Sequence, residues 1–496
     1  MGEIKNSELE AAFAYYRKGI VGIDRSISTP FGEQPLVYLD WTASGRLYGP
    51  IERILSDRFG PLVANTHSAS TTTGMTMTYA YHEAHRIIKA HVGAGNNDII
   101  ITHGSGMTGA VNKLQRILGL RLHEHFAGKI TISREERPVV FITHMEHHSN
   151  QTSWLETIAD VVIIGADEHG LVDPNDLDIH LNRYADRKYK YGSFTAASNV
   201  TGIATPYHRL ARIMHEHGGF AFVDFAAAAP YVDIAMHPAD EREKLDAVMF
   251  SPHKFLGGPG SAGVLVFDRR LYGNGVPDTV GGGIVDWTNP WGEHKFIDDI
   301  ETREDAGTPP FLQTIKAALA IKLKEEMGTA QIRMREREIV EQVFDGLRAI
   351  PNLVILAGHI TDRLPIFSFY ITGVHYNLVV KLLNDRYGIQ TRGGCSCAGT
   401  YGHFLLHVDR AHSHEITEKI SHGDLSEKPG WVRISYHPTT TDAEVALSLR
   451  AIADIARHAE EYGNEYSYDR HSNEFLHHTA DIDADMDRVR KMFDLS

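Results

Sequence analysis

The sequence predicts an α/β protein in which a largely parallel sheet is covered by helices on both faces and is followed by a smaller α+β unit. Up to about residue 310, apolar runs with strand-like patterns alternate with runs of helical spacing, as they do in parallel sheets with helical crossovers. Beyond that point, long amphipathic helices dominate. The length of 496 residues is typical of two or three domains, and a hydrophobic content of 42% is enough to fill their cores.

The large unit contains a clear series of predicted elements. Residues 8–20 form a short helix, and the run 37–47 is a strand that enters a loop. Apolar runs that end in polar or glycine-rich loops are predicted as further strands, and these are 98–104, 138–150, 160–167, 219–230, 245–260 and 262–268. Apolar side chains recur at helical spacing in 107–122 and 207–218.

The second unit has a different pattern. Its predicted helices are 311–328, 331–350 and 441–463, and its predicted strands are 364–371 and 431–438. We therefore divide the chain into an N-terminal arm (1–34), a large domain (35–310), a small domain (311–463) and a tail (464–496). Only the end of the tail has helical spacing, so His471, His477 and His478 are predicted to be solvated rather than bound to a metal.

Charge and cysteine content narrow the class of protein. Lys and Arg number 49 and Asp and Glu 64, so the net charge is −15, which argues against a nucleic-acid partner. The sequence has neither a signal peptide nor an apolar run long enough to cross a membrane, so we expect a cytoplasmic protein. The only cysteines are Cys395 and Cys397, which excludes a disulfide framework and a cysteine-based zinc site; no metal is predicted.

One lysine stands where open α/β sheets place their active sites. Lys254 lies in FSPHKFLGGPG (250–260), in a loop at the carboxyl end of a predicted strand. Ser251 and His253 are polar neighbours, and the glycines permit close backbone approach. Lys254 could form a Schiff base with an aldehyde cofactor, or it could be a surface lysine in a glycine-rich loop.

Three further segments carry possible cofactor contacts. Asp224 follows a strand 30 residues before Lys254, where it could pair with a protonated ring nitrogen or simply end the strand. His147 in THMEHHSN (143–150) could stack on a cofactor ring or act as an acid or base. The segment THGSGMTGAVNKL (102–114) has the small residues of a phosphate site at a helix start, although many turns look similar.

Both cysteines lie in one glycine-rich segment, QTRGGCSCAGTYG (390–402). The glycines favour a mobile loop, and the guanidinium of Arg392 would favour a thiolate. Cys397 could therefore be a nucleophile on a flexible arm. The alternatives are a redox pair and two inert small residues.

Taken in order, these segments resemble the class V, fold-type I pyridoxal-phosphate enzymes, most closely the group II cysteine desulfurases and selenocysteine lyases. The resemblance covers roughly residues 35–460 and implies a mainly parallel seven-stranded sheet in the large domain. FSPHKFLGGPG is similar to S-G-H-K-x-x-G-P-x-G, EHHSN to E-H-H-A-N, and SNVTG (198–202) to S-N-V-x-G. The implied roles are a Schiff base at Lys254, phosphate contacts at Ser251 and His253, ring stacking at His147, the ring hydroxyl at Asn199 and the pyridinium nitrogen at Asp224.

The same resemblance implies a shared active site and a substrate. REDAGTP (303–309) resembles F-E-A-G-T-P, so Thr308 would reach the phosphate of the neighbouring subunit in a homodimer. RGGCSCAG resembles R-T-G-x-x-C-A, which puts Cys397 rather than Cys395 at the sulfur-accepting position and Arg392 near the substrate. WVRISYHPTTTDAEV matches the family's R-x-S strand, so Arg433 would hold the carboxylate of an amino acid.

The implied reaction removes sulfur or selenium from L-cysteine or selenocysteine through a persulfide on Cys397, with a sulfur-acceptor protein as a possible partner. Ala227 stands where the family has a glutamine, and G-S-G-M-T replaces G-T-T-E, so that Gly106 or Thr108 would contact the phosphate. Extra residues fall near 120–137, near 403–430 and in the tail. These departures keep open another class V reaction, such as transamination, epimerisation or β- or γ-elimination, and a binding protein that kept only the fold.

Overall fold

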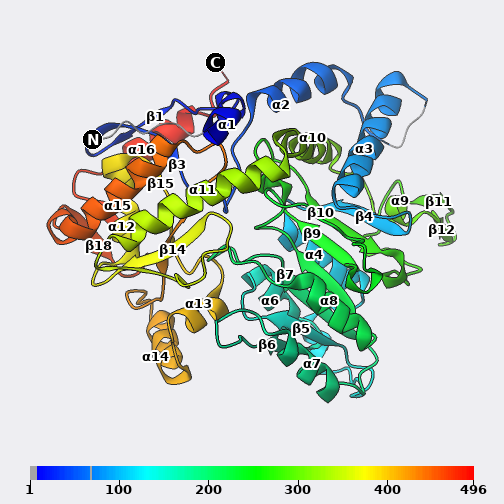
Figure 1. Cartoon of the computed structure of the whole chain (residues 1–496). Helices are drawn as coiled ribbons and strands as arrows, with labels where there is room; N and C mark the ends of the chain where they lie inside the picture. Colours follow the sequence, from blue (N-terminus) through cyan, green and yellow to red (C-terminus); the bar gives the residue numbers. More distant parts are fainter. Residues whose placement is uncertain (1–7, 67–69, 496) are drawn as a thin grey trace.

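A seven-stranded sheet forms the centre of the molecule. The computed structural model describes residues 8–66 and 70–495, and its strand order is β4-β10-β9-β8-β7-β5-β6 (Figure 1). The strands are β4 (Asp98–His103), β5 (Val139–Thr143), β6 (Asp160–Ile164), β7 (Lys190–Thr195), β8 (Phe220–Asp224), β9 (Ala247–Phe250) and β10 (Gly263–Asp268). Strands β5 to β9 run parallel, whereas β10 is antiparallel to both β9 and β4. The predicted α/β class is confirmed, but the sequence reading missed β7.

Helices cover both faces of this sheet. In β5, Val139 and Phe141 belong to the core on one face, and Val140 and Ile142 to the core on the other. The first face packs against α3 (Thr72–His91), α7 (Pro174–Arg183), α8 (Tyr207–Glu216) and α10 (Phe311–Met327). The second face packs against α4 (Met107–Ile117) and α6 (His148–Leu155). Because both faces are buried, the parallel strands read as continuous apolar runs.

A second, antiparallel sheet has its own core. Its strand order is β13-β14-β17-β16, formed by β13 (Leu353–Ile355), β14 (Ile366–Ile371), β16 (Arg392–Gly394) and β17 (Trp431–Ser435). It packs with α11 (Thr329–Arg348), α12 (Tyr376–Tyr387) and α15 (Asp442–Gly463). Strand β3 (Val37–Tyr38) pairs with β15 (Ile389–Gln390) of this unit. The chain therefore contacts the smaller unit before it enters the large sheet.

Shorter elements complete the described chain. The helices are α1 (Glu8–Lys18), α2 (Gly49–Arg53), α5 (Glu124–Ala127), α9 (Ile300–Arg303), α13 (Gly399–Leu405), α14 (Arg410–Ser421) and α16 (Ile482–Lys491). Three hairpins pair β1 (Ser26–Thr29) with β2 (Gly32–Pro35), β11 (Val285–Thr288) with β12 (His294–Phe296), and β18 (Tyr466–Asp469) with β19 (Glu474–His477). Single π- or 3-10-helical turns lie at Ile54–Phe59, Gly60–Leu62, Glu241–Glu243, Pro252–Lys254 and Arg269–Leu271.

The tail is not simply solvated, which corrects the sequence reading. Its β18–β19 hairpin buries His477, whose ring lies edge-on to Tyr466 at 5.0 Å between ring centres. The hairpin also meets the inserted segment near 403–430, because the Leu425 N–H donates to the Arg470 carbonyl over 2.9 Å. His471 remains exposed, and its Nδ1 lies 2.8 Å from the Gly423 carbonyl. The two segments that the family pattern lacks therefore support each other.

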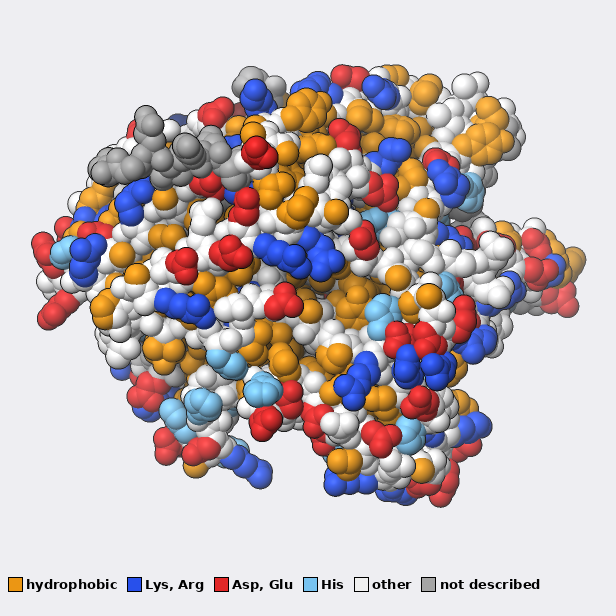
Figure 2. Space-filling view, viewed as in Figure 1, with side chains coloured by type: hydrophobic (Ala, Val, Ile, Leu, Met, Phe, Trp, Pro, Cys, Tyr) orange, Lys and Arg blue, Asp and Glu red, His pale blue; other side chains and the backbone are white. Residues whose placement is uncertain are grey.

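Histidines gather over the inserted helices α13 and α14 on the face shown in Figure 2, where acidic and basic side chains are otherwise interspersed. Within residues 8–66 and 70–495, no three His, Cys, Asp or Glu side chains are placed to hold a metal ion. In the same ranges, no helix is long and apolar enough to cross a membrane.

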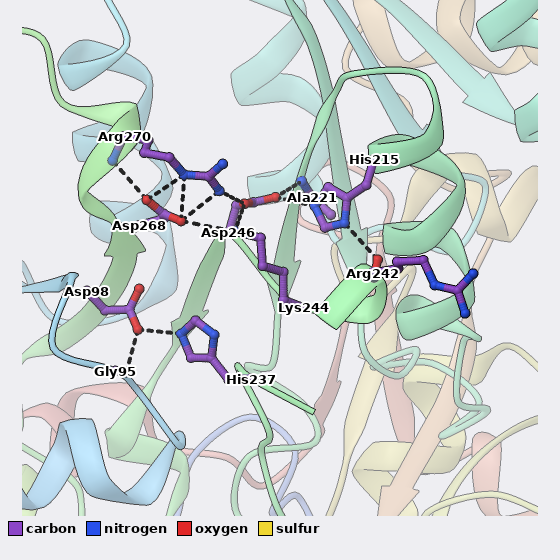
Figure 3. A network of polar contacts seen from close by, with 10 residues as sticks. All are labelled: Gly95, Asp98, His215, Ala221, His237, Arg242, Lys244, Asp246, Asp268 and Arg270. Atoms are coloured by element: carbon purple, nitrogen blue, oxygen red, sulfur yellow. Dashed lines mark hydrogen bonds and ion pairs between the residues drawn. The ribbon is translucent and has the colours of Figure 1, made fainter. Parts of the chain in front are cut away.

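Buried carboxylates link β4, β8, β9 and β10 at one end of the sheet (Figure 3). Asp246, just before β9, accepts the Ala221 N–H over 2.9 Å and a hydrogen bond from Arg270 Nη2 over 3.1 Å. His215 Nε2 of α8 lies 2.7 Å from the Asp246 carboxylate. Asp98 at the start of β4 accepts the Gly95 N–H and contacts His237 Nε2, each over 2.6 Å. This network holds the edge of the sheet opposite the cavity described below.

We expect the contact between His215 and Asp246 to make stability depend on pH. Burial disfavours the charged imidazole, but the hydrogen bond and the charge of Asp246 outweigh it, so the pKa of His215 is raised. A raised pKa in the folded state gives stability that is fully present below the unfolded pKa of about 6.5 and is lost as pH rises through the folded pKa. The free energy of unfolding can be measured with urea at pH 6 and at pH 8. Between these two pH values, the wild type should lose about 1 kcal/mol more of it than His215→Gln does. Parallel pH profiles for the two proteins would refute this account.

Candidate active site

The predicted site residues surround one cavity at the carboxyl ends of β7, β8 and β9. The cavity has a volume of about 370 Å³ and is also bordered by the start of α4. Ten of the residues singled out in the sequence line it, namely Gly106, Thr108, His147, Asn199, Asp224, Ser251, His253, Lys254, Arg392 and Arg433. The other two, Cys397 and Thr308, lie outside its lining. The fold thus brings together groups that are spread over more than 300 positions of the sequence.

Lys254 and Asp224 form the electrostatic centre of the cavity. Lys254 ends the helical turn after β9, and Asp224 is the last residue of the neighbouring β8. Burial lowers the pKa of Lys254 to about 8, against the opposing charge of Asp224. Burial raises the pKa of Asp224 to about 6. Near neutral pH the carboxylate is therefore ionised, and the amine can exchange a proton easily, as a catalytic base or nucleophile must.

The start of α4 forms a cradle for an anion. Gly106 is the N-cap of this helix, and the Met107 N–H donates to Ser251 Oγ over 2.8 Å. A Cβ atom on Gly106 would lie 2.9 Å from Ser251 Oγ and 3.4 Å from His253 Cδ2. Thr108 Oγ1 lies 2.7 Å from Ser149 Oγ at the same cavity wall. Glycine at this position therefore lets Ser251 and His253 approach the N-terminus of α4 closely, and a helix N-terminus is a place where backbone N–H groups bind phosphate.

His147 presents a neutral ring to the cavity. It caps the N-terminus of α6, where its Nδ1 accepts the Ser149 N–H over 3.1 Å. Burial, followed by the nearby charge of Lys254, lowers the pKa of His147 to about 3. A neutral imidazole held by its capping bond is suited to lie against a flat aromatic group.

Some polar atoms in the lining of the cavity lack hydrogen-bond partners among the described residues. Asn199 Nδ2 donates to the Ser396 carbonyl over 2.7 Å. Asn199 Oδ1 and Ser396 Oγ are buried and have no hydrogen-bond partner among the described residues. Ala227, which replaces the family's glutamine, also lines this cavity. Because buried polar groups are normally paired, these atoms indicate a site built for a polar ligand.

The cysteine loop is anchored rather than free, in contrast to the flexible arm expected from its glycines. Ser396 and Cys397 have φ values of 51° and 56°, in the left-handed region that such residues rarely adopt. The His148 N–H donates to the Cys397 carbonyl over 2.7 Å, and the Gly399 N–H donates to His148 Nε2 over 2.9 Å. Asn199 holds the same loop through Ser396.

The two cysteines have different surroundings. Cys397 is exposed and directly follows Ser396, which lines the cavity. Cys395 is half-buried and packs against the large core. Cys397 therefore lies at the rim of the cavity, whereas Cys395 is partly enclosed by the large core.

Sequence reasoning missed two acidic residues that position the site. Asp40, two residues after β3, accepts a hydrogen bond from Arg433 Nη2 over 2.7 Å. Glu146, directly before His147, accepts from Thr143 Oγ1 over 2.7 Å, from the Thr195 N–H over 2.9 Å and from Asn150 Nδ2 over 2.7 Å. Burial raises the pKa of Glu146 to about 8. Two features of the sequence could have indicated them. Asp40 is an acidic residue at the end of a strand, and Glu146 is the first residue of the motif EHHSN.

Thr308 lies beside a second, larger cavity of about 1020 Å³. This cavity shares Ser105 and His253 with the one that contains Lys254. The structure describes one chain, so the role of Thr308 across a subunit interface remains a prediction.

Comparisons with known proteins agree on a family. Residues 37–447 match the family described as Aminotransferase class-V, whose members depend on pyridoxal 5′-phosphate. A probable cysteine desulfurase of Halobacterium salinarum is 28% identical over 370 residues, covering 74% of this chain and 83% of the relative. The fold is similar to that of the apo cysteine desulfurase of Thermococcus onnurineus NA1, with a TM-score of 0.70 and 21% identity over 92% of this chain and 100% of that one. It is also similar to an Escherichia coli cysteine desulfurase, with a TM-score of 0.68 and 21% identity over 90% and 98% of the two chains.

We expect Gly106→Ala to weaken retention of pyridoxal phosphate, because the added methyl group would push Ser251 and His253 away from the N-terminus of α4, where they would hold the phosphate. Equilibrium dialysis should show the dissociation constant rising by about tenfold or more, equivalent to the loss of about 1.4 kcal/mol. Gly128→Ala is the matched control, since a Cβ at Gly128 meets nothing within 4 Å. Equal retention by both variants would exclude the cradle as the phosphate site.

Proposed function

The chain belongs to the aminotransferase class-V family, and we propose that it is a pyridoxal-phosphate-dependent cysteine desulfurase acting on L-cysteine or selenocysteine. The observation that carries this proposal is the placement of Cys397 at the rim of the cavity that holds Lys254, Asp224 and Arg433. The names of the relatives that match about three-quarters of the chain support the same activity.

The residues present fit the cofactor. The cavity at the N-terminus of α4 and the unpartnered Asn199 Oδ1 accommodate a phosphate and a polar ring substituent. When bound, pyridoxal phosphate supplies an electron sink for the α-carbon of an amino acid. Lys254 would hold its aldehyde carbon, Asp224 would keep a proton on its ring nitrogen, and His147 would cover its ring. The phosphate would be held by Gly106, Thr108, Ser251 and His253.

Arg433 is prepared to bind the substrate carboxylate. It is buried, Asp40 fixes one end of its guanidinium, and its Nη1 donates to the Asn199 carbonyl over 3.3 Å. Its Nε has no hydrogen-bond partner among the described residues and remains available as a donor. A guanidinium held in this way can pair with a carboxylate in a fixed orientation. Arg392 would add positive charge at the exposed side.

Lys254 and Cys397 would divide the chemistry between them. Lys254, whose pKa of about 8 allows it to gain and lose a proton, would move protons at the substrate carbon atoms. The thiolate of Cys397 would attack the substrate sulfur, so that an S–S bond forms as the Cβ–S bond breaks. The electron pair released to Cβ is protonated, and the products are alanine and a persulfide on Cys397. A sulfur-acceptor protein would then take up the outer sulfur atom.

We also propose that the protein is a homodimer located in the cytoplasm. A homodimer would bring Thr308 to the phosphate of the neighbouring subunit, next to the large cavity that shares Ser105 and His253 with the site. Two free cysteines, one exposed, suit a reducing compartment, and we place the protein in the cytoplasm.

The direct test compares Cys397→Ala with Cys395→Ala in alanine formation from L-cysteine. We expect Cys397→Ala to lose about 100-fold or more in kcat, since it removes the sulfur nucleophile, and Cys395→Ala to stay close to wild type. Equal rates for wild type and Cys397→Ala would overturn the persulfide role. Selenocysteine as substrate separates the two chemistries, because activity that survives Cys397→Ala only with selenium would identify a selenocysteine lyase.

A second candidate is another class V reaction, such as transamination, epimerisation or β- or γ-elimination on a different amino acid. It is favoured by Ala227, whose small side chain lines the cavity and leaves Asn199 as the remaining amide there. Absorption spectra of the loaded enzyme with a panel of amino acids discriminate between the two, because a response to L-cysteine alone supports the desulfurase.

A further inference from the structure

The last helix lies outside the part of the chain that matches the family. Helix α16 follows residue 447, where the family match ends, and lies at the outer edge of the molecule near α15 (Figure 1). None of its residues is buried. Its hydrogen bonds and ion pairs, as far as the structure describes them, are local to residues 481–494. The rest of this chain thus leaves the helix largely uncovered.

One side of α16 nevertheless carries large apolar residues. Ile482, Met486 and Val489 of the helix, and Phe493 in the turn after it, are spaced by four, three and four residues, the pattern of a helix that packs against another helix. Their exposed fractions are 55%, 49%, 55% and 80%. Met492, next to this stripe, is 79% exposed. Soluble chains rarely leave such a stripe uncovered unless it is an interaction surface.

The charges of the helix are arranged by sign. The acidic residues Asp481, Asp483, Asp485 and Asp487 precede the basic residues Arg488, Arg490 and Lys491. The excess of acids over bases does not favour an anionic lipid surface. Two such helices aligned in parallel would bring acid against acid, whereas an antiparallel pair brings the acidic half of each against the basic half of the other.

We propose that α16 packs antiparallel against α16 of a second copy of this chain, about a two-fold axis. Such an interface uses the same patch on both copies. Pairing the apolar stripes places Met486 level with Val489 of the other copy, and Ile482 level with Phe493. It also places Asp483 close to Arg490 of the other copy. The apolar side chains would lose water while the opposite charges meet at the sides of the seam.

The pair is too small to hold two chains by itself. Stable interfaces bury about 1,600 Å² in total, which a contact between two helices of ten residues does not supply. The helix pair therefore adds to another contact between the same chains, or it joins two dimers. In either case the neighbour of α16 is a second α16.

Cysteine cross-linking of the full-length, cofactor-loaded protein tests both the contact and its direction. In a Cys395→Ser, Cys397→Ser background, we would introduce Met486→Cys, Ile482→Cys or Phe493→Cys singly and add a short bis-maleimide. Met486→Cys should give a product of twice the chain mass, because the two copies of residue 486 are about 4.5 Å apart along the axis. Arg337→Cys, on the exposed side of α11, is the control for chance collisions.

Cysteines at the two ends of the apolar stripe show whether the two helices run antiparallel or parallel. Ile482→Cys alone should not cross-link, because its two copies are about 16 Å apart along the axis in an antiparallel pair. An equal mixture of Ile482→Cys and Phe493→Cys chains, unfolded and refolded together, should cross-link to about half the yield of Met486→Cys, because half of the random pairs are mixed. Cross-linking of Ile482→Cys to itself would show a parallel pair and overturn the proposal. A yield for Met486→Cys no higher than for Arg337→Cys would show that α16 does not meet α16.

Discussion

The site depends on removing the amine of Lys254 from water beside a buried carboxylate. Burial alone would favour the neutral forms of both groups, and the pKa of Lys254 falls to about 8 while that of Asp224 rises to about 6. Each charge offsets part of the penalty on the other, so both remain usable near neutral pH. The parallel sheet makes this possible, because β8 and β9 are neighbours and end at the same edge.

A short segment joins this centre to the part of the site that lies on the smaller sheet. After β3, Asp40 binds Arg433, and the Thr42 N–H donates to Ser435 Oγ over 3.0 Å. Next, the Gly45 N–H donates to the His253 carbonyl over 2.9 Å, beside Lys254. A Cβ on Gly45 would lie 2.0 Å from the Phe255 carbonyl oxygen, so only glycine allows this approach. The segment therefore fixes the distance between the group that binds the substrate and the group that reacts.

Sequence alone predicted the α/β class and the groups around the cavity because apolar runs and short motifs are local signals. It missed β7, whose residues KYGSFT look polar yet are fully buried between β5 and β8, since burial there is set by the neighbouring strands. It missed Asp40 because pairing across 393 positions leaves no local pattern. The anchoring of the cysteine loop by His148 was hidden for the same reason. The prediction of a solvated tail was wrong because the inserted segment near 403–430 holds the β18–β19 hairpin.

The most direct test of the account locates the sulfur atom. The enzyme is incubated with L-cysteine in the absence of reductant and digested with trypsin, and the peptide 393–410, which carries both cysteines, is fragmented in a mass spectrometer. The account predicts one added sulfur atom on Cys397 and none on Cys395, because Cys397 lies at the rim of the cavity near Arg433. Alanine formation with unmodified Cys397, or with the sulfur on Cys395, would contradict it.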